Sequence, residues 1–326
     1  MSRTAWATVL FTILLALCTV ALMARWVYDH RIGTLQESVI LIPKGSSFQN
    51  IVDLLSQHNA LAYPSFFYGA EGLLGHHRFY PSGEFRVPAG LTYRQLSLFL
   101  RRTKPLQHPI QVLEGSTVAT VLHHIQHHPL LTGPMGDTPA EGTLFAETYA
   151  VTHGADRRQL LNRMQAMMNK HLSALWQTRN PDVPLKTPEE ALILASIVEK
   201  ESGGNDDQQY VASVFLNRLK AGMPLQADPT IIYALSGGSG RLNRPLNRQD
   251  WTFNSPYNTY LQTGLPPSPI AIPSLGALQA VLNPITTSYY YFVADGKGGH
   301  IFSTSLNDHN RHVRSFYRMK KDTASP

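Results

Sequence analysis

The stretch 187-TPEEALILASIVEKES-202 gives the strongest structural signal in the chain. Thr187 is a good N-cap residue, Pro188 suits the first turn of a helix, and Glu190 completes the pattern of a capping box. Residues 191–198 are apolar or small on every side, which predicts a helix that is buried all round. Charged residues and two glycines follow and provide a stop signal. We therefore expect the core of a folded domain to be built around this helix.

Two carboxyl groups stand at the end of this predicted helix. Glu199 shares a helix face with Leu192 and Ser196, so its carboxyl group would be partly shielded from water and its pKa would rise. A carboxyl group that stays protonated near neutral pH can act as a general acid. Glu201 stands four residues after Ile197 and three after Val198, so it also shares a helix face with apolar side chains. The spacing therefore does not choose between Glu199 and Glu201. A solvated helix end with an ordinary charge cluster explains the same pattern.

The sequence after this helix predicts two more helices, a long loop and a hairpin. Residues 207–221 have apolar side chains at helical spacing. Asp228 stands at the start of a shorter helix, where it suits a capping role as well as a chemical one. Residues 255–274 form a long loop rich in Pro, Gly, Tyr and Asn, which is typical of functional loops and would suit a carbohydrate surface. Residues 288–306 are predicted to form an aromatic β-hairpin.

Upstream, the same local pattern occurs three times. Short strands near residues 39, 85 and 110 each lead through a turn with glycine to a Ser or Thr and then to an amphipathic helix. These repeats indicate small α+β modules, although three ordinary strand-to-helix corners would look alike. Residues 156–177 predict a longer helix whose methionine-rich stripe, including Met164 and Met168, is interpreted as core filling.

The N-terminus contains a candidate membrane span. Residues Thr4 to Ala24 form an uncharged, mostly apolar run. As a helix that rises about 1.5 Å per residue, the run covers roughly 31 Å, close to the ~30 Å hydrocarbon core of a bilayer. A cleaved signal peptide needs small residues at −3 and −1, and Leu22 fits the −3 position poorly; a lipoprotein signal needs a small residue before Cys18, and Leu17 is not small. An uncleaved single-span anchor is the leading interpretation, with a cleaved signal or a buried helix as alternatives.

Composition excludes several classes of protein. Only 15% of the 326 residues are charged and 43% are hydrophobic, which excludes a largely disordered chain. One cysteine excludes a disulfide scaffold and a multi-cysteine zinc module. The histidine pairs within residues 123–128 share helix faces but lack a third ligand at a recognisable spacing, so neither a metal nor a cofactor is expected. A net charge of +6 favours an anionic partner, and the lack of a basic stripe argues against nucleic acid.

Four ordered blocks of sequence carry a family resemblance. They are LASIVEKES (194–202), VASVFLNRLKAGMPLQADPTIIYAL (211–235), SPYNTYLQTGLPP (255–267) and YFVADGKGGHIFSTSLNDHN (291–310). Together with EGTLFAETY (141–149), these blocks resemble the endolytic murein transglycosylase (YceG-like) family. Residues 38–105 resemble, more weakly, the LysM-like module of that family.

The resemblance implies an α+β architecture with one N-terminal transmembrane helix, a small LysM-like α+β module and an α+β catalytic domain. It implies a single-pass protein of the inner (cytoplasmic) membrane with its C-terminal domain on the periplasmic, extracytoplasmic side. The expected boundaries are a cytoplasmic tip and anchor at 1–24, a linker at 25–37, the module at 38–105, the catalytic domain at 106–320 and a tail at 321–326.

The implied activity is lytic cleavage within peptidoglycan glycan strands. The bond broken would join N-acetylmuramic acid to N-acetylglucosamine, leaving 1,6-anhydro ends that terminate or trim nascent strands, without a cofactor. The family's catalytic acid is matched to the first glutamate of the VEKE block, which is Glu199. Gln226, Asp228, Tyr257 and Asn258 stand in the matching motifs and are candidates for substrate binding. The implied partners are glycan strands and peptidoglycan synthases.

Some positions depart from the family pattern. Thr143, Ala146 and Glu147 replace the usual residue types in the 141–149 block, and Ser268 and Ile272 replace the usual Gly and Asn after GLPP. These changes bear on the detail of the cleft. The alternative function is a non-catalytic glycan-binding membrane anchor or scaffold for cell-wall synthases.

Overall fold

The computed structural model describes residues 3–30, 36–202 and 207–323, and it is a mixed α+β structure with a long apolar N-terminal helix. Helix α1 (Arg3–Asp29) contains the one span among the described residues that is long and apolar enough to cross a membrane, Trp6–Asp29. The chain divides into two compact units, residues 1–108 with 150–155 and residues 109–149 with 156–326. Each is described by itself.

The first unit packs helices against a two-stranded sheet. β1 (Ser38–Ile42) pairs antiparallel with β2 (Gly83–Val87) in a register that sets Ile40 opposite Phe85. Alternate residues of each strand point into the core, and both Ile40 and Phe85 are buried. The strands pack with the helices α2 (Phe48–Gln57), α3 (Pro64–Leu73) and α4 (Tyr93–Arg102), and a short 3-10 turn, η1 (His76–Arg78), follows α3.

The three predicted strand–turn–helix corners are confirmed. The third consists of β3 (His108–Gln111) and α5 (Val118–Gln126). Each turn contains a glycine with positive φ, and each helix is capped by the side chain of Ser47, Thr92 or Thr117, which accepts the backbone N–H three residues on. At Thr92 the partner Gln95 completes a capping box. The third cap is Thr117, one residue beyond the predicted Gly-Ser turn.

Helix α1 continues past the apolar run and packs onto the first unit. Residues 25–29 are helical, so the expected linker begins as an extension of the anchor helix. Tyr28 is buried, and its hydroxyl donates to the buried carboxylate of Glu71 on α3. Asp29 forms an ion pair with Arg94 on α4. The remaining expected linker falls partly on residues 31–35, which lie outside the described residues.

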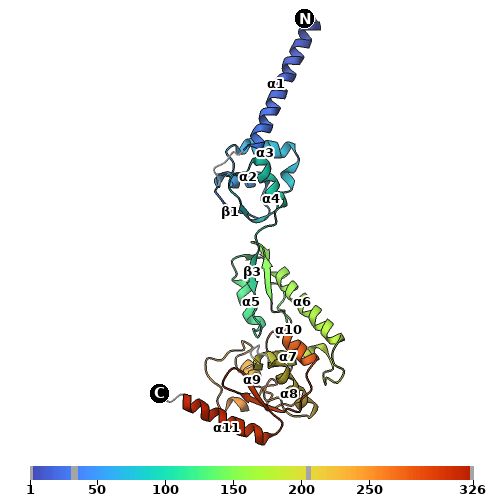
Figure 1. Cartoon of the computed structure of the whole chain (residues 1–326), viewed down its shortest axis with the longest axis vertical. Helices are drawn as coiled ribbons and strands as arrows, with labels where there is room; N and C mark the ends of the chain where they lie inside the picture. The colour runs from blue at the N-terminus through green and yellow to red at the C-terminus, as the bar shows by residue number, and fades with distance from the viewer. Residues whose placement is uncertain (1–2, 31–35, 203–206, 324–326) are drawn as a thin grey trace. The chain divides into compact units, whose positions relative to one another are not determined.

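The second unit is built around the predicted buried helix. That helix is α7 (Pro188–Ser202), and it contacts α6 (Arg157–Gln177), α8 (Gln208–Lys220), α9 (Asp228–Leu235) and α10 (Leu275–Leu282). Figure 1 shows α7 among α8, α9 and α10. Residues 191–199 of α7 are all buried, because neighbours cover every face, as the uniformly apolar sequence predicts. Met164 and Met168 of α6 are buried, in agreement with a core-filling role.

The remaining elements of the second unit include the predicted hairpin. β7 (Tyr291–Ala294) pairs antiparallel with β8 (His300–Ser303), and the turn is closed by Asp295, whose N–H donates to the Gly299 carbonyl oxygen at 2.8 Å. The other elements of this unit are β4 (Leu131–Thr132), the 3-10 turn η2 (Asp250–Thr252) and α11 (Leu306–Thr323). Two short strands, β5 (Thr148–Val151) and β6 (Ala155–Asp156), contain residues of both units.

Candidate functional site

Glu199 is held inside the helical core of the second unit. Its side chain is only 5% exposed. One carboxylate oxygen, Oε2, accepts the backbone N–H of Ser274 at 3.1 Å and the side-chain amide of Gln208 at 3.3 Å. Ser274 caps α10 and Gln208 begins α8, so the Glu199 carboxylate joins the ends of three helices.

A loop that follows β3 covers the same helix end. The Lys200 ammonium donates to the Gly115 carbonyl oxygen at 3.2 Å, and the Gly115 N–H donates to the Ile272 carbonyl oxygen at 2.8 Å. A Cβ added to Gly115 would lie 3.9 Å from Cγ of Glu199. The neighbouring Glu114 is affected too, because partial burial and the charge of Glu199 raise the pKa of its carboxyl group. Glu199 is therefore enclosed by a loop and two helix ends.

Glu201 lies in an open pocket of about 450 Å³. The lining residues come from α7, α8, α9, the hairpin β7–β8 and α11, and from two loops, the one between α8 and α9 and the long loop that contains Tyr260. Most of them are polar or aromatic: Glu201, Arg218, Leu225, Gln226, Asp228, Tyr260, Phe292, Val293, Ala294, His300 and His309. Two predicted site residues, Gln226 and Asp228, thus meet Glu201. Glu199 is not among the lining residues, because it lies about 200° around α7 from Glu201.

The surroundings of Glu201 make its carboxyl group an unusually weak acid. Burial raises the pKa of the Glu201 carboxyl group from its ordinary value of 4.5 to about 8, and the nearby carboxylate of Asp228 adds to the rise. The guanidinium of Arg218 and the backbone amide of Asp228 oppose it without cancelling it. Glu201 therefore keeps its proton at neutral pH and is available to donate it.

Asp228 is held by two aromatic side chains. Its Oδ1 accepts the hydroxyl of Tyr260 at 2.7 Å and the indole N–H of Trp251 at 3.1 Å. Burial and the Asp228 charge raise the pKa of Tyr260 well above its usual range, so Tyr260 stays a donor. The sequence-based alternative that Asp228 caps α9 is wrong, because the N-cap is Ala227 and no side chain caps this helix.

Gln226 occupies a strained turn at the edge of the pocket. Its φ of +52° is in the left-handed region that favours glycine. The turn is retained by the hydrogen bond of the Gln226 N–H to the Thr259 carbonyl oxygen, 3.0 Å, and by Arg218, whose guanidinium donates to the Leu225 carbonyl oxygen at 2.7 Å. Arg218 is only 7% exposed and also donates to the Tyr290 carbonyl oxygen, so it ties this turn to the hairpin. Backbone strain of this kind is typical of functional sites.

Tyr257 and Asn258 lie in the long loop but outside the lining of the pocket. The Tyr257 hydroxyl bonds with that of Ser268 at 2.7 Å, and its ring packs on Tyr233. Asn258 is completely buried; its side-chain N–H groups donate to the carbonyl oxygens of Trp251 and Phe253. Asn258 therefore shapes the loop that carries Trp251 toward Asp228, and direct contact with substrate stays a prediction for both residues.

Two histidines of the pocket were not selected as site residues from the sequence. His300 of β8 donates its backbone N–H to Asp207 at 2.8 Å, and its Nδ1 lies 3.1 Å from the same carboxylate oxygen. His309 of α11 stacks on Tyr291, and its buried Nδ1 has no hydrogen-bond partner among the described residues. Burial lowers the pKa of His309, which favours the neutral ring. The signal for both was their position beside the hairpin in the 291–310 block.

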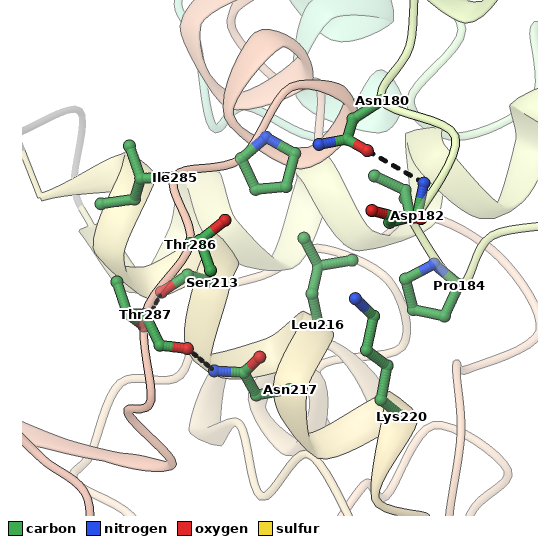
Figure 2. A pocket seen from close by; sticks show the side chains of 12 residues that line it. Asn180, Asp182, Pro184, Ser213, Leu216, Asn217, Lys220, Ile285, Thr286 and Thr287 are labelled. Carbon is green, nitrogen blue, oxygen red and sulfur yellow. Dashed lines mark hydrogen bonds between the residues drawn. The ribbon is translucent and has the colours of Figure 1, made fainter.

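A second, smaller cavity of about 150 Å³ is lined by α8 and the loops around residues 180–184 and 284–287 (Figure 2). Several of its polar groups are already paired: Ser213 with Thr287 at 2.8 Å, Asn217 with the Thr287 carbonyl oxygen at 3.0 Å, and Asn180 with the Asp182 N–H at 2.9 Å. These bonds stabilise the loops and leave few groups for a ligand. In the described ranges no group of three or more His, Cys, Asp or Glu side chains could hold a metal ion.

Comparisons with known proteins agree on one family. Residues 40–315 match the family model described as the YceG-like family. A Bacillus subtilis protein named endolytic murein transglycosylase is 34% identical over 186 residues, which are 56% of this chain and 50% of that protein. One of the same name from Streptococcus pneumoniae serotype 2 is 35% identical over 187 residues, 55% of this chain and 33% of that protein. The matches thus span half or less of these relatives' length.

A crystal structure of a putative yceG-like protein from Listeria monocytogenes aligns with a TM-score of 0.49 and 25% identity. The alignment covers 85% of this chain and 98% of the Listeria chain.

Proposed function

Because this chain belongs to the YceG-like family, we propose that it is a membrane-anchored endolytic transglycosylase of peptidoglycan. The bond cleaved joins N-acetylmuramic acid to N-acetylglucosamine inside glycan strands, and the products carry 1,6-anhydro ends. The single observation that carries the proposal is the open pocket in which Glu201 of the VEKE block meets Gln226 and Asp228. The two curated relatives compared share the name of the activity, and their names supply the substrate class.

We assign the general acid to Glu201 and keep Glu199 as the competing assignment. Glu201 lines a pocket large enough for a sugar unit, and the pocket brings it together with Gln226 and Asp228. Glu199 is enclosed, and its Oε2 already accepts two hydrogen bonds. The VEKE block contains both glutamates, so the resemblance supports a catalytic role for this block whichever residue acts.

The reaction needs one carboxyl group acting twice. Glu201 donates its proton to the glycosidic oxygen, and the bond from that oxygen to the anomeric carbon breaks. The C6 hydroxyl oxygen of the same muramic acid unit bonds to the anomeric carbon, and the Glu201 carboxylate takes the hydroxyl proton. No water is consumed, and the carboxyl group is restored. The intramolecular attack gains from proximity.

Asp228 has two roles in this scheme. Its charge helps to keep the pKa of Glu201 high, and it would stabilise the positive charge that develops on the sugar ring in the transition state. Tyr260 and Trp251 hold the Asp228 carboxylate in one orientation. Gln226 and Tyr257 are proposed to position the glycan, and Asn258 acts through the shape of its loop.

The cellular role follows from the anchor. The apolar span of α1 is consistent with an anchor or a signal sequence, and we propose an uncleaved anchor in the cytoplasmic membrane with the remainder on the outer side. Residues 38–105 are proposed as a LysM-like glycan-binding module. Cleavage near the membrane would terminate or trim strands beside the peptidoglycan synthases, which are the proposed partners.

The test is mass spectrometry of products after the full-length protein is incubated with purified peptidoglycan. We expect fragments one water lighter than hydrolysis products, and we expect Glu201→Gln to abolish them. Glu199→Gln is the matched control, since it changes a carboxyl group on the same helix outside the pocket. Reducing ends would instead indicate a hydrolase. Intact glycan that still binds the wild-type protein would support the non-catalytic anchor.

If Glu199→Gln abolishes the products while Glu201→Gln retains them, the acid is Glu199. Circular dichroism and melting temperature of both variants distinguish lost chemistry from lost structure. Glu199→Gln retains an acceptor oxygen for the Ser274 N–H, so a folded variant is expected.

A further inference from the structure

An apolar groove lies at the foot of α1 in the first unit. Its volume is about 490 Å³, and it is lined by Ala24 and Tyr28 of α1, by Phe66 and Leu73 of α3, and by Arg94 of α4. Phe66 and Leu73 are seven residues apart, so they lie on one face of α3. Figure 1 shows α3 beside the end of α1. The groove therefore continues the apolar surface of the span onto the folded unit.

The C-terminal end of α3 exposes large apolar side chains to an unusual degree. Leu73 is 92% exposed, and Leu74 and Phe79 are more than half exposed. Trp26, two residues from both Ala24 and Tyr28 and so on the other side of α1, is 59% exposed. Exposed large apolar side chains gathered at one helix end indicate an interaction surface rather than an ordinary soluble face.

Two tryptophans of α1 are spaced to match the two interfaces of a lipid bilayer. Trp6 and Trp26 are separated by 20 residues of continuous helix, or about 30 Å, which equals the thickness of the hydrocarbon core. Tryptophan is enriched at both membrane–water interfaces. With the two rings at the two interfaces, Ala24 and Tyr28 lie at headgroup level, and the groove that they line lies there too.

Buried contacts fix the first unit to the end of α1. The Tyr28 hydroxyl donates to Glu71 on α3, and Glu71 also accepts the hydroxyls of Tyr80 at 2.6 Å and Ser97 at 2.7 Å. Burial opposes ionisation of Glu71, but these hydrogen bonds outweigh it and hold its pKa below the usual range, so it stays a charged acceptor. Because Glu71 lies in the turn before Leu74, α3 is held where α1 leaves the span.

We propose that α3 and the groove at the foot of α1 are embedded in the interfacial layer of the same bilayer that α1 spans, with Leu73 and Leu74 among the acyl chains. Three exposed arginines lie on the elements around the patch: Arg25, with 76% of its side chain exposed, Arg78 in η1, and Arg94, with 56% exposed. Arg25 and Arg94 share one anionic partner, Asp29, so the group keeps a net positive charge. They suit lipid phosphates, as at other amphipathic surface helices. The proposal rests on α1 as an uncleaved anchor and is independent of the catalytic assignment.

The experiment measures the depth of spin labels on the full-length protein in nanodiscs of phosphatidylethanolamine and phosphatidylglycerol. Nitroxides are attached to Leu73→Cys and Leu74→Cys in a Cys18→Ala background. Lys44→Cys, at an exposed turn after β1, is the matched control, and native Cys18 reports on the span. Accessibility to oxygen, which concentrates in lipid, is compared with accessibility to a water-soluble nickel chelate.

We expect the oxygen-to-nickel ratio at Leu73 and Leu74 to exceed that at Lys44 several-fold and to approach that at Cys18. A ratio equal to that of Lys44 overturns the proposal and leaves α3 in water. Protection from both reagents overturns it in favour of a protein occupant of the groove. A water-like ratio at Cys18 removes the premise that α1 spans, without affecting the catalytic proposal.

Discussion

The carboxyl group of Glu201 should make the stability of the protein depend on pH in a way that Glu201→Gln removes. Its pKa is raised by burial and by Asp228 from 4.5 to about 8 in the folded protein. A group whose pKa is higher when folded binds its proton more tightly when folded. Its stabilising contribution is therefore fully present below pH 4.5 and is lost as the pH rises through 8.

The size of this effect follows from the two pKa values. Each pH unit between them is worth about 1.36 kcal/mol, so the full effect is at most about 5 kcal/mol of unfolding free energy. Glu201 is partly exposed, and solvent screening reduces the effect, so we expect ~2–5 kcal/mol. Most of the loss falls between pH 5 and pH 8. A glutamine side chain has no proton to lose, so this part of the pH dependence disappears in the variant.

The assay is urea unfolding of the full-length protein in one detergent. It is repeated at several pH values between about 5 and 8.5, a range that covers most of the interval between the two pKa values of Glu201. In a Trp6→Phe, Trp26→Phe background, the fluorescence of the remaining Trp176 and Trp251 follows the second unit. The variant should gain stability relative to the wild type as the pH rises, although it loses activity. Glu199→Gln, measured in parallel, tests whether the effect belongs to the pocket.

One result would refute the reasoning. If the difference in unfolding free energy between wild type and Glu201→Gln is the same at every pH, Glu201 titrates as an ordinary carboxyl group and is not kept protonated by the pocket. If the difference in unfolding free energy from the wild type grows with pH for Glu199→Gln and not for Glu201→Gln, the general acid is Glu199.

Three further substitutions test the fold that carries the site. Gly142→Ala should destabilise the protein by at least about 2 kcal/mol in thermal unfolding, because φ is +77° and the new Cβ would lie 2.6 Å from the ring of Pro269; an unchanged melting temperature would contradict this geometry. Thr92→Ala removes the cap of α4 and should cost about 1 kcal/mol in urea unfolding, whereas Thr92→Ser should restore most of it. Phe67→Ala empties a completely buried position and should cost about 3–5 kcal/mol; a loss below 1 kcal/mol would mean that the core of the first unit is loosely packed.

Local sequence signals predicted much of the secondary structure because their causes lie within a few residues. Ser47 and Thr92 cap the next helix through backbone groups three residues away, and a glycine in each preceding turn adopts the left-handed conformation. The hairpin after residue 288 is predicted for the same reason. The cap of α9 was mispredicted, since Asp228 is drawn instead to Trp251 and Tyr260, which follow it by more than 20 residues.

The sequence by itself determined that a buried helix ends in two glutamates, that a long apolar span precedes the folded units, and that the chain carries the blocks of its family. Only the tertiary structure decided which glutamate faces an open pocket. Residues 199 and 201 are about 200° apart around a helix, so their environments depend on what packs on each side. Ser274 caps α10 and Asp228 begins α9, and no pattern within α7 encodes their positions. Burial and charge, which set the acidity of a carboxyl group, are therefore properties of the folded neighbourhood and not of the helix alone.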